Sequence, residues 1–321
     1  MKSESKANKT QYEPMKAKTI LNPVKAPSMP FDYSINPYRG CQHGCSFCYA
    51  RSTHEFLGVE ADDTFQNRIF MKSEAPEILR EQIEKRLRSK KPTSSWGQIT
   101  IGTATDPYQQ IESKAKLTRG CLEVLVEYQL PVSITTRSPL ILRDIDLLTQ
   151  LNSISVNVSI STLSNNVWRQ FEPSTPSPAQ RLSTVAQLNA EGIRAGVFAA
   201  PILPYITDSK SDLDELVAAA AEAHAQFLMP SYLRLSTSAV KVWFFQTLQQ
   251  HYPELTEKYA KLYASSGYAP SSYREPNMRY IEALLRQHKI GMQKIVPNPQ
   301  KDMTPAAMQQ QPEGPVQLTL F

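Results

Sequence analysis

The run Asn36-Pro-Tyr-Arg-Gly-Cys-Gln-His-Gly-Cys-Ser-Phe-Cys-Tyr-Ala-Arg51 holds three of the four cysteines of the chain, Cys41, Cys45 and Cys48. Their spacing is C-x3-C-x2-C, so one short loop brings all three thiols together at little cost in chain entropy. A cubane iron–sulfur cluster is ordinarily held by four thiolates, and three leave one iron open to another ligand. The run therefore predicts an iron–sulfur cluster with one open iron.

A structural zinc site is the alternative for the same cysteines, with His43 or His54 as its fourth ligand. Structural zinc ligands usually come as two separated pairs, and this run has no second pair. The remaining cysteine, Cys121, lies far along the chain in a stretch with helical character. The spacing therefore favours the cluster.

The composition is typical of an intracellular enzyme. A chain of 321 residues, 41% hydrophobic and 20% charged, can bury a substantial core. Three of its four cysteines share one loop, which leaves no disulfide framework and favours a reducing compartment. The N-terminus has no apolar leader, and no apolar stretch is long enough to span a membrane. We therefore expect a cytoplasmic protein.

The two ends of the chain differ from its centre. Residues 1–26 carry six lysines against two glutamates, and residues 1–30 are predicted to be a disordered basic arm. This arm either contacts a polyanion such as DNA or is simply solvated. From about Pro297 the chain is rich in proline and glutamine, which predicts a disordered tail over 297–321.

Between the ends, β-rich runs alternate with helical patterns in the rhythm of a parallel α/β barrel. Six runs are predicted core strands: 31–36, 98–103, 132–136, 154–160, 194–200 and 227–235. Residues 31–235 thus form the predicted core, and 65–72 an insertion. Residues 236–296 read as a helical extension rich in aromatic residues, which either closes the open side of the barrel or stacks bases. Helical packing is the favoured interpretation.

Polar residues follow four of these strands. In parallel α/β folds the functional groups gather at the carboxyl ends of the strands. Hydroxyls and an arginine there would bind a cofactor, although ordinary turn chemistry needs the same residues. The four ends are Gly102-Thr-Ala-Thr-Asp-Pro-Tyr108, Thr135-Thr-Arg-Ser138, Val158-Ser-Ile-Ser161 and Ala199-Ala-Pro-Ile-Leu-Pro204.

The cysteine spacing, with Phe47 just before the third cysteine, resembles the cluster loop of the radical S-adenosylmethionine (SAM) enzymes. The resemblance implies an α/β fold with a partial six-stranded (β/α)6 barrel, a 4Fe-4S cluster and bound SAM. In that family the open iron holds the amino and carboxylate groups of SAM. The reduced cluster cleaves SAM to a 5'-deoxyadenosyl radical, which abstracts a hydrogen atom. An electron donor such as flavodoxin or ferredoxin is also implied.

Most of residues 31–235 resemble the branch of spore photoproduct lyase and its relatives, described as DNA repair photolyases. The resemblance implies a radical relay at Tyr49. It implies a contact from Ser159 toward the methionine carboxylate of SAM, and one from Arg137, where the lyase has lysine. Glu172 and Arg181 form either a ribose or carboxylate clamp or an ordinary ion pair. The predicted cofactor contacts are Phe47, Thr103, Thr105, Arg137, Ser159, Glu172 and Arg181.

One strand end departs from the lyase pattern. The lyase has Cys-x-Ser-Asp, whose cysteine returns a hydrogen atom to the product radical, whereas this chain has Thr103-Ala-Thr-Asp106. The O–H bond of threonine is too strong to serve as that donor. Unless Cys121 reaches the site, the chain is not a spore photoproduct lyase in the strict sense.

The last residues, Gln317-Leu-Thr-Leu-Phe321, resemble the QL(S/D)LF peptide by which bacterial repair proteins dock on the sliding clamp. Leu320 and Phe321 would fill an apolar cleft, while Gln317 bonds at its rim and Leu318 lies between them. The expected function is therefore radical SAM chemistry on nucleic acid, in DNA repair or modification. The alternatives are the same chemistry on a protein or metabolite, and a non-catalytic metal-binding adaptor at DNA.

Overall fold

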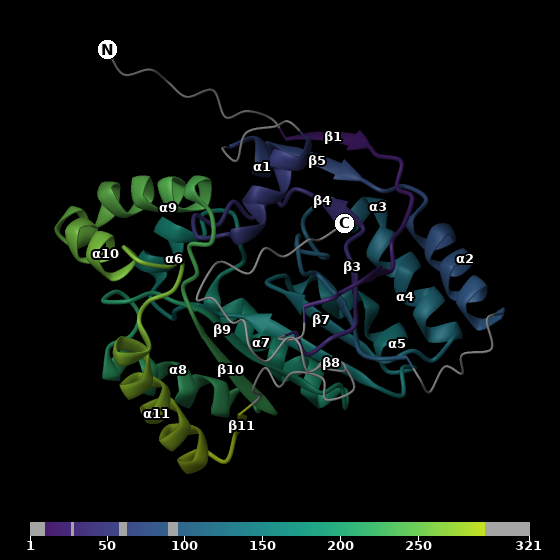
Figure 1. The fold of residues 1–321 in the computed structure, drawn as a ribbon. Coiled ribbons are helices and arrows are strands. Elements are labelled where there is room, and N and C mark those ends of the chain that lie inside the picture. Colours follow the sequence, from purple (N-terminus) through teal and green to yellow (C-terminus); the bar gives the residue numbers. More distant parts are fainter. Residues whose placement is uncertain (1–9, 27–28, 58–62, 89–95, 293–321) are drawn as a thin grey trace, which may run out of the picture.

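The computed structural model describes residues 10–26, 29–57, 63–88 and 96–292, and its centre is one large sheet (Figure 1). The strand order is β11-β10-β9-β8-β7-β6-β3-β2. Six neighbouring strands run parallel: β3 (Tyr33–Ile35), β6 (Ile99–Ile101), β7 (Val132–Thr136), β8 (Ile154–Ser159), β9 (Ala195–Ile202) and β10 (Phe227–Tyr232). The six predicted core strands are confirmed.

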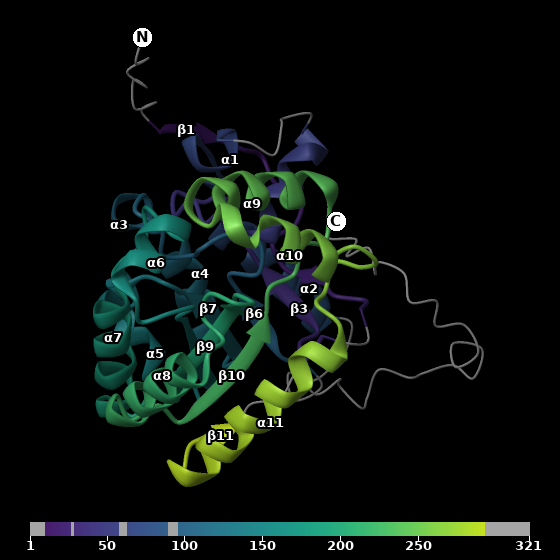
Figure 2. The same ribbon diagram turned by 90° about the vertical axis from the view of Figure 1, so that its left-hand side faces the viewer.

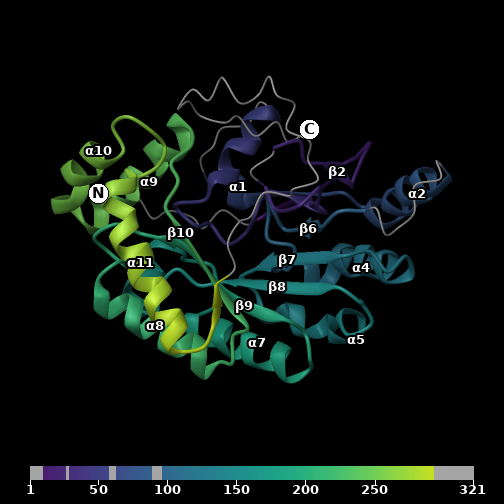
Figure 3. The same cartoon turned by 60° about the horizontal axis from the view of Figure 1, so that its bottom comes forward.

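These six strands follow one another across the sheet in chain order, as in a (β/α) barrel. A doubly wound sheet would instead reverse its order at a switch point. Helices lie outside the strands (Figure 3): α2 (Ala75–Arg88), α4 (Leu117–Glu127), α5 (Ile145–Leu148), α7 (Pro178–Ala190) and α8 (Lys210–Glu222). Short strands flank the six, β2 (Asn22–Pro23) antiparallel and β11 (Gly291–Met292) parallel. The sheet is thus open, in agreement with a partial barrel.

The two faces of the sheet differ in polarity because side chains alternate along each strand. Aliphatic residues such as Ile134 and Val156 pack on the outer helices. The inward positions carry small polar side chains, among them Thr100, Ser133, Thr135, Ser155, Asn157 and Ser159. In a closed barrel, branched apolar residues fill the interior. Here the small polar residues leave a hollow.

A second, three-stranded sheet joins the N-terminal segment to the loop region. In it, β5 (Arg68–Met71) lies between β1 (Gln11–Pro14) and β4 (Tyr38–Arg39). Arg68 pairs with Glu13 across β1 and β5, with 2.7 Å between Nε and Oε1, and Ile20 is fully buried. The predicted disorder of residues 1–30 is therefore wrong for residues 10–26, because the open edge of β5 supplies hydrogen bonds that composition does not reveal. Residues 1–9 lie outside the described residues.

The C-terminal region begins with α9 (Ser238–His251) and α10 (Thr256–Leu262), which lie over the end of the sheet near the three-stranded sheet (Figure 2). Their buried aromatic side chains Phe244, Tyr259 and Tyr263 share an apolar cluster with Cys45 and Phe47 of the cysteine run. The prediction that these aromatic residues pack against the barrel is confirmed, since they cover the side where the cysteines lie.

The last described helix, α11 (Ser271–Gln287), packs against α8 and β10, and β11 then adds a strand to the main sheet. A purely helical extension over 236–296 is therefore the wrong description, because the chain returns to the sheet edge. The tail 297–321, with the residues of the predicted clamp peptide, lies outside the described residues. No helix in the described ranges is long and apolar enough to cross a membrane.

Candidate functional site

A cavity of about 470 Å³ lies on the inward face of the main sheet, where the strands end. Small-molecule sites in proteins are about 300–1,000 Å³. All three cysteines of the run line it. The predicted residues Phe47, Tyr49, Thr103, Thr105, Arg137 and Ser159 line it as well. Tertiary structure therefore gathers most of the predicted site in one place.

The cysteine loop runs from β4 to the 3-10 helix η1 (Tyr49–Leu57) and owes its shape to glycine and to one buried arginine. Gly40 has a φ of +84°, and a Cβ there would lie 2.7 Å from the carbonyl oxygen of Arg68, so only glycine fits. Arg51 is fully buried and donates hydrogen bonds to the carbonyl oxygens of Gly44 and Cys45, at 3.2 and 3.3 Å. These bonds hold the loop around the three thiols.

The thiols themselves are free of disulfide bonds. Burial raises the pKa of Cys45 to about 12 and also raises the pKa of Cys41. Both thiols therefore keep their protons at neutral pH unless a metal displaces them. Within the described ranges, no three His, Cys, Asp or Glu side chains converge as ligands of a single ion. A cubane needs no such convergence, because each thiolate binds a different iron. Three free thiols on one cavity wall fit such a cluster.

Asp106 anchors the cysteine loop to the end of β6. Its Oδ2 lies 3.3 Å from Nδ1 of His43, which sits between two cysteines, and accepts a bond of 2.7 Å from the backbone N–H of Arg137. Its Oδ1 accepts a bond of 2.7 Å from the Thr136 hydroxyl. Burial alone would raise the pKa of Asp106, but His43 and these hydrogen bonds outweigh it and lower the pKa to about 2. Asp106 is therefore a fixed negative charge behind the cavity.

Arg137 reaches the cavity from the end of β7. Its guanidinium lies 5.8 Å from the centre of the Phe47 ring, and its Nε donates to Oε2 of Glu172 at 3.2 Å. The side chain is 20% exposed, so part of the guanidinium faces the cavity. A planar guanidinium fixed in this way can bind a carboxylate with two parallel hydrogen bonds.

Tyr49 and Thr103 meet at the mouth of the cavity. The Tyr49 hydroxyl donates a short hydrogen bond to the carbonyl oxygen of Thr103, and its side chain is 41% exposed. The Thr103 hydroxyl accepts a bond of 2.9 Å from Nδ2 of Asn36. The Thr105 hydroxyl instead donates to the carbonyl oxygen of Gly40 at 2.6 Å. Thr105 therefore positions the cysteine loop, which corrects its prediction as a cofactor contact.

Glu172 and Arg181 do not line the cavity, and the prediction of a cofactor clamp gives way to its alternative. Both are almost fully buried, with 2.7 Å between Arg181 Nη1 and Glu172 Oε2. Ser161 also donates a hydrogen bond to Glu172. Burial alone would raise the pKa of Glu172, but Arg181 and Arg137 outweigh it and lower the pKa. The pair is thus a buried support for Arg137.

Cys121 lies in α4, fully buried in the apolar core between sheet and helices, and does not line the cavity. The departure seen at Thr103 therefore stands, since Cys121 brings no thiol to this site in place of the lyase cysteine.

Several cavity residues escaped the sequence analysis. His43 entered it only as a zinc ligand, and Asp106, Asn157, Arg234 and Tyr268 did not enter as site residues. Asp106 and Asn157 belong to the polar strand ends, so an inward-facing count along each strand would have found them. Arg234 and Tyr268 lie beyond the last helical turn of the barrel, where no periodic signal marks them.

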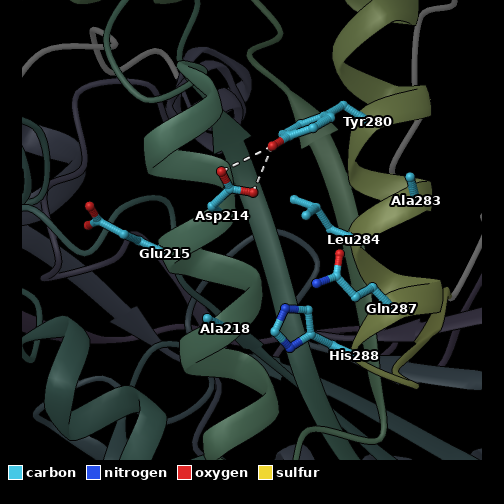
Figure 4. A pocket seen from close by; sticks show the side chains of 8 residues that line it. All are labelled: Asp214, Glu215, Ala218, Tyr280, Ala283, Leu284, Gln287 and His288. Carbon is cyan, nitrogen blue, oxygen red and sulfur yellow. Dashed lines mark hydrogen bonds between the residues drawn. The ribbon is translucent and has the colours of Figure 1, made fainter.

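A second hollow lies between α8 and α11, on the outer helical layer (Figure 4). Its volume is about 510 Å³, and the Tyr280 hydroxyl bonds Asp214 across it at 2.8 Å. No cysteine lines it. The cavity at the strand ends therefore remains the candidate site.

Three comparisons place the chain among known proteins. Residues 35–218 match the Radical SAM superfamily. An uncharacterised protein of Mycobacterium tuberculosis is 34% identical over 310 residues, which cover 95% of this chain and 86% of that protein.

Two solved structures share the fold. A spore photoproduct lyase variant with bound AdoMet and dinucleoside spore photoproduct superposes with a TM-score of 0.58 at 17% identity, covering 86% of this chain and 78% of the lyase. SuiB of Streptococcus suis bound to the precursor peptide SuiA has a TM-score of 0.53 at 15% identity, covering 81% of this chain and 48% of SuiB. With three thiols in one cavity and a superfamily match over more than half its length, the chain belongs to the radical SAM superfamily.

Proposed function

We propose that Cys41, Cys45 and Cys48 hold a 4Fe-4S cluster, that the same cavity binds SAM, and that the enzyme acts on nucleic acid. The observation that carries this proposal is the shared wall of the three thiols and Arg137 at the ends of parallel strands. When bound and reduced, cluster and SAM supply a 5'-deoxyadenosyl radical. The superfamily generally uses this pair of cofactors.

Arg137 is the residue suited to the carboxylate of SAM. Glu172 fixes its guanidinium from behind and Phe47 packs beside it, so little side-chain entropy is lost on binding. Ser159 lines the cavity two strands' width from the cysteine loop and offers a hydroxyl. Tyr49 covers the mouth, where its phenol is the nearest redox-active side chain to Cys48 in sequence.

The charge of the lining favours an anionic substrate. Two arginines, Arg137 and Arg234, face one carboxylate, Asp106, which is already paired with His43. At the rim the Arg234 guanidinium lies 5.2 Å from the centre of the Tyr268 ring, which is 45% exposed. A cation beside an exposed aromatic ring suits a phosphate next to a stacked base. The dinucleoside in the lyase structure supports this choice, while the peptide in SuiB keeps a protein substrate as the second candidate.

The test begins with anaerobic reconstitution of the whole chain. We expect about four irons per protein, as for a cubane, and reductive cleavage of SAM to 5'-deoxyadenosine. Cys45→Ala should abolish both, whereas Cys121→Ala, in the core, should keep both. A colourless zinc protein, or SAM cleavage by the Cys45→Ala variant, would overturn the cluster assignment. Crosslinking the reduced enzyme in cells then separates nucleic acid from protein substrates.

A further inference from the structure

The inward face of β8 carries a buried amide one layer below the cavity mouth. Asn157 lies two residues before Ser159 on the same strand, roughly 7 Å deeper into the sheet. In the sheet register its neighbour on β7 is Thr135 and its neighbour on β9 is Gly196, which adds no side chain. Asn157 therefore projects from the wall of the cavity it lines.

Only one end of this amide is satisfied. Its Nδ2 donates to Ser133 Oγ at 3.1 Å and to Thr135 Oγ1 at 3.4 Å. Its Oδ1 has no hydrogen-bond partner in the described part of the chain, although the residue is only 5% exposed. Native proteins pair almost all buried polar atoms. A fixed, unpaired acceptor in a ligand-sized cavity thus calls for a ligand that donates a hydrogen bond.

We infer that Asn157 is a specificity-determining residue of a substrate subsite and that its Oδ1 accepts a hydrogen bond from an N–H group of a nucleobase. This inference rests on the proposed action on nucleic acid. Amides recognise bases through such bonds. Phe198 and Met229 line the same cavity and offer an aromatic and a thioether surface to a flat ring. The cysteines lie at the strand ends, so a base at Asn157 sits deeper than the cluster loop.

The subsite can be tested by pairing a change in the protein with a change in the ligand. The probes are the dinucleotide dTpdT and its form methylated at N3 of both bases, which removes the N–H. Binding is measured by anaerobic calorimetry on the reconstituted full chain with SAM. We expect methylation to weaken binding to the native protein about ten-fold, since a buried acceptor is then left unpaired.

Asn157→Leu should bind dTpdT about ten-fold more weakly and should no longer distinguish it from the methylated form, since the two changes remove the same bond. Asn157→Asp, which keeps an acceptor oxygen, should still prefer dTpdT. Asn152→Leu makes the same change at an exposed position just before β8 and should bind like the native protein. If Asn157→Leu does not fold, as judged by circular dichroism, Asn157→Ser removes the same oxygen with a smaller change.

Two outcomes would overturn the inference, and they are distinguishable. Equal binding of both dinucleotides by the native protein, or an undiminished preference in Asn157→Leu, would remove the subsite while leaving action on nucleic acid intact. No binding of any oligonucleotide by a protein that still cleaves SAM would remove nucleic acid as the substrate, and the nucleobase with it.

Discussion

The guanidinium carbon of Arg51 lies 4.3 Å from the centre of the Trp243 ring. Arg51 ends the cysteine run and Trp243 belongs to α9, in the last third of the chain. The same guanidinium donates to the Gln66 side chain at 2.8 Å and to the backbone of the loop. The C-terminal helices therefore help to shape the loop that carries the three thiols.

Loss of this contact should loosen the cluster. Trp243→Leu removes a desolvated cation–π contact, which is expected to destabilise the apoprotein by about 1–2 kcal/mol and to speed iron loss. Arg51→Lys keeps the charge but loses the planar fork, and should lose iron in the same way. The measurements are urea unfolding and iron retained after gel filtration. Val242→Ala, at an exposed neighbouring position, is the control. Unchanged iron retention in both variants would show that α9 has no part in holding the loop.

Arg137→Met should weaken SAM binding at least ten-fold, because a charge-assisted hydrogen bond to a carboxylate is lost. Arg137→Lys should recover part of the affinity. Equilibrium dialysis with labelled SAM on the reconstituted protein measures both. Arg169→Met, at an exposed position of α6 (Asn165–Phe171), should bind SAM normally. Equal affinity in Arg137→Met would assign the carboxylate to another residue.

The protein should not return spore photoproduct to thymines efficiently, because Thr103 stands where the lyase has its cysteine and Cys121 does not line the cavity. Chromatography of a dinucleoside spore photoproduct reaction measures the thymidine released. Thr103→Cys is expected to create a trace of repair, and Thr103→Ser, without a thiol, none. Efficient repair by the native protein would mean that another hydrogen donor, such as Tyr49, acts.

We propose that the terminal residues Gln317, Leu318, Leu320 and Phe321 dock on a bacterial sliding clamp. A peptide of residues 314–321 should bind the clamp in the micromolar range, about −8 kcal/mol, as measured by calorimetry. A peptide with alanine at positions 320 and 321 should not bind, because its two anchors are gone. Equal binding of both peptides would remove the proposal.

Acid should weaken the fold through Asp106. Its pKa in the fold is about 2, below the ordinary value of 3.8, so its stabilising effect is complete above pH 4 and is lost as the pH falls toward 2. A shift of this size corresponds to about 2 kcal/mol. Asp106→Asn apoprotein should be less stable than native apoprotein near pH 6, and urea unfolding should show the difference shrinking at low pH. A constant difference would place the effect in packing.

The strand pattern of this chain could be predicted because each core strand is bounded by helices and carries β-branched residues at alternate positions, as in Val132–Thr136. The N-terminal segment could not, since β1 is short and polar and becomes a strand only where β5 offers it an edge. The role of Glu172 was equally hidden. A carboxylate near a strand end reads the same whether it faces a ligand or two buried arginines.

The sequence by itself determined the cysteine loop, the six parallel strands and the polar strand ends, because these follow from spacing and from the alternation of side chains along a strand. Only the tertiary structure decided which polar groups face the cavity. It turned Thr105 and Glu172 inward as supports, left Arg137 in the wall, and brought Trp243 under the loop. The reason is physical: hydrogen bonds and burial depend on residues that lie far apart in the chain and meet only when the sheet is assembled.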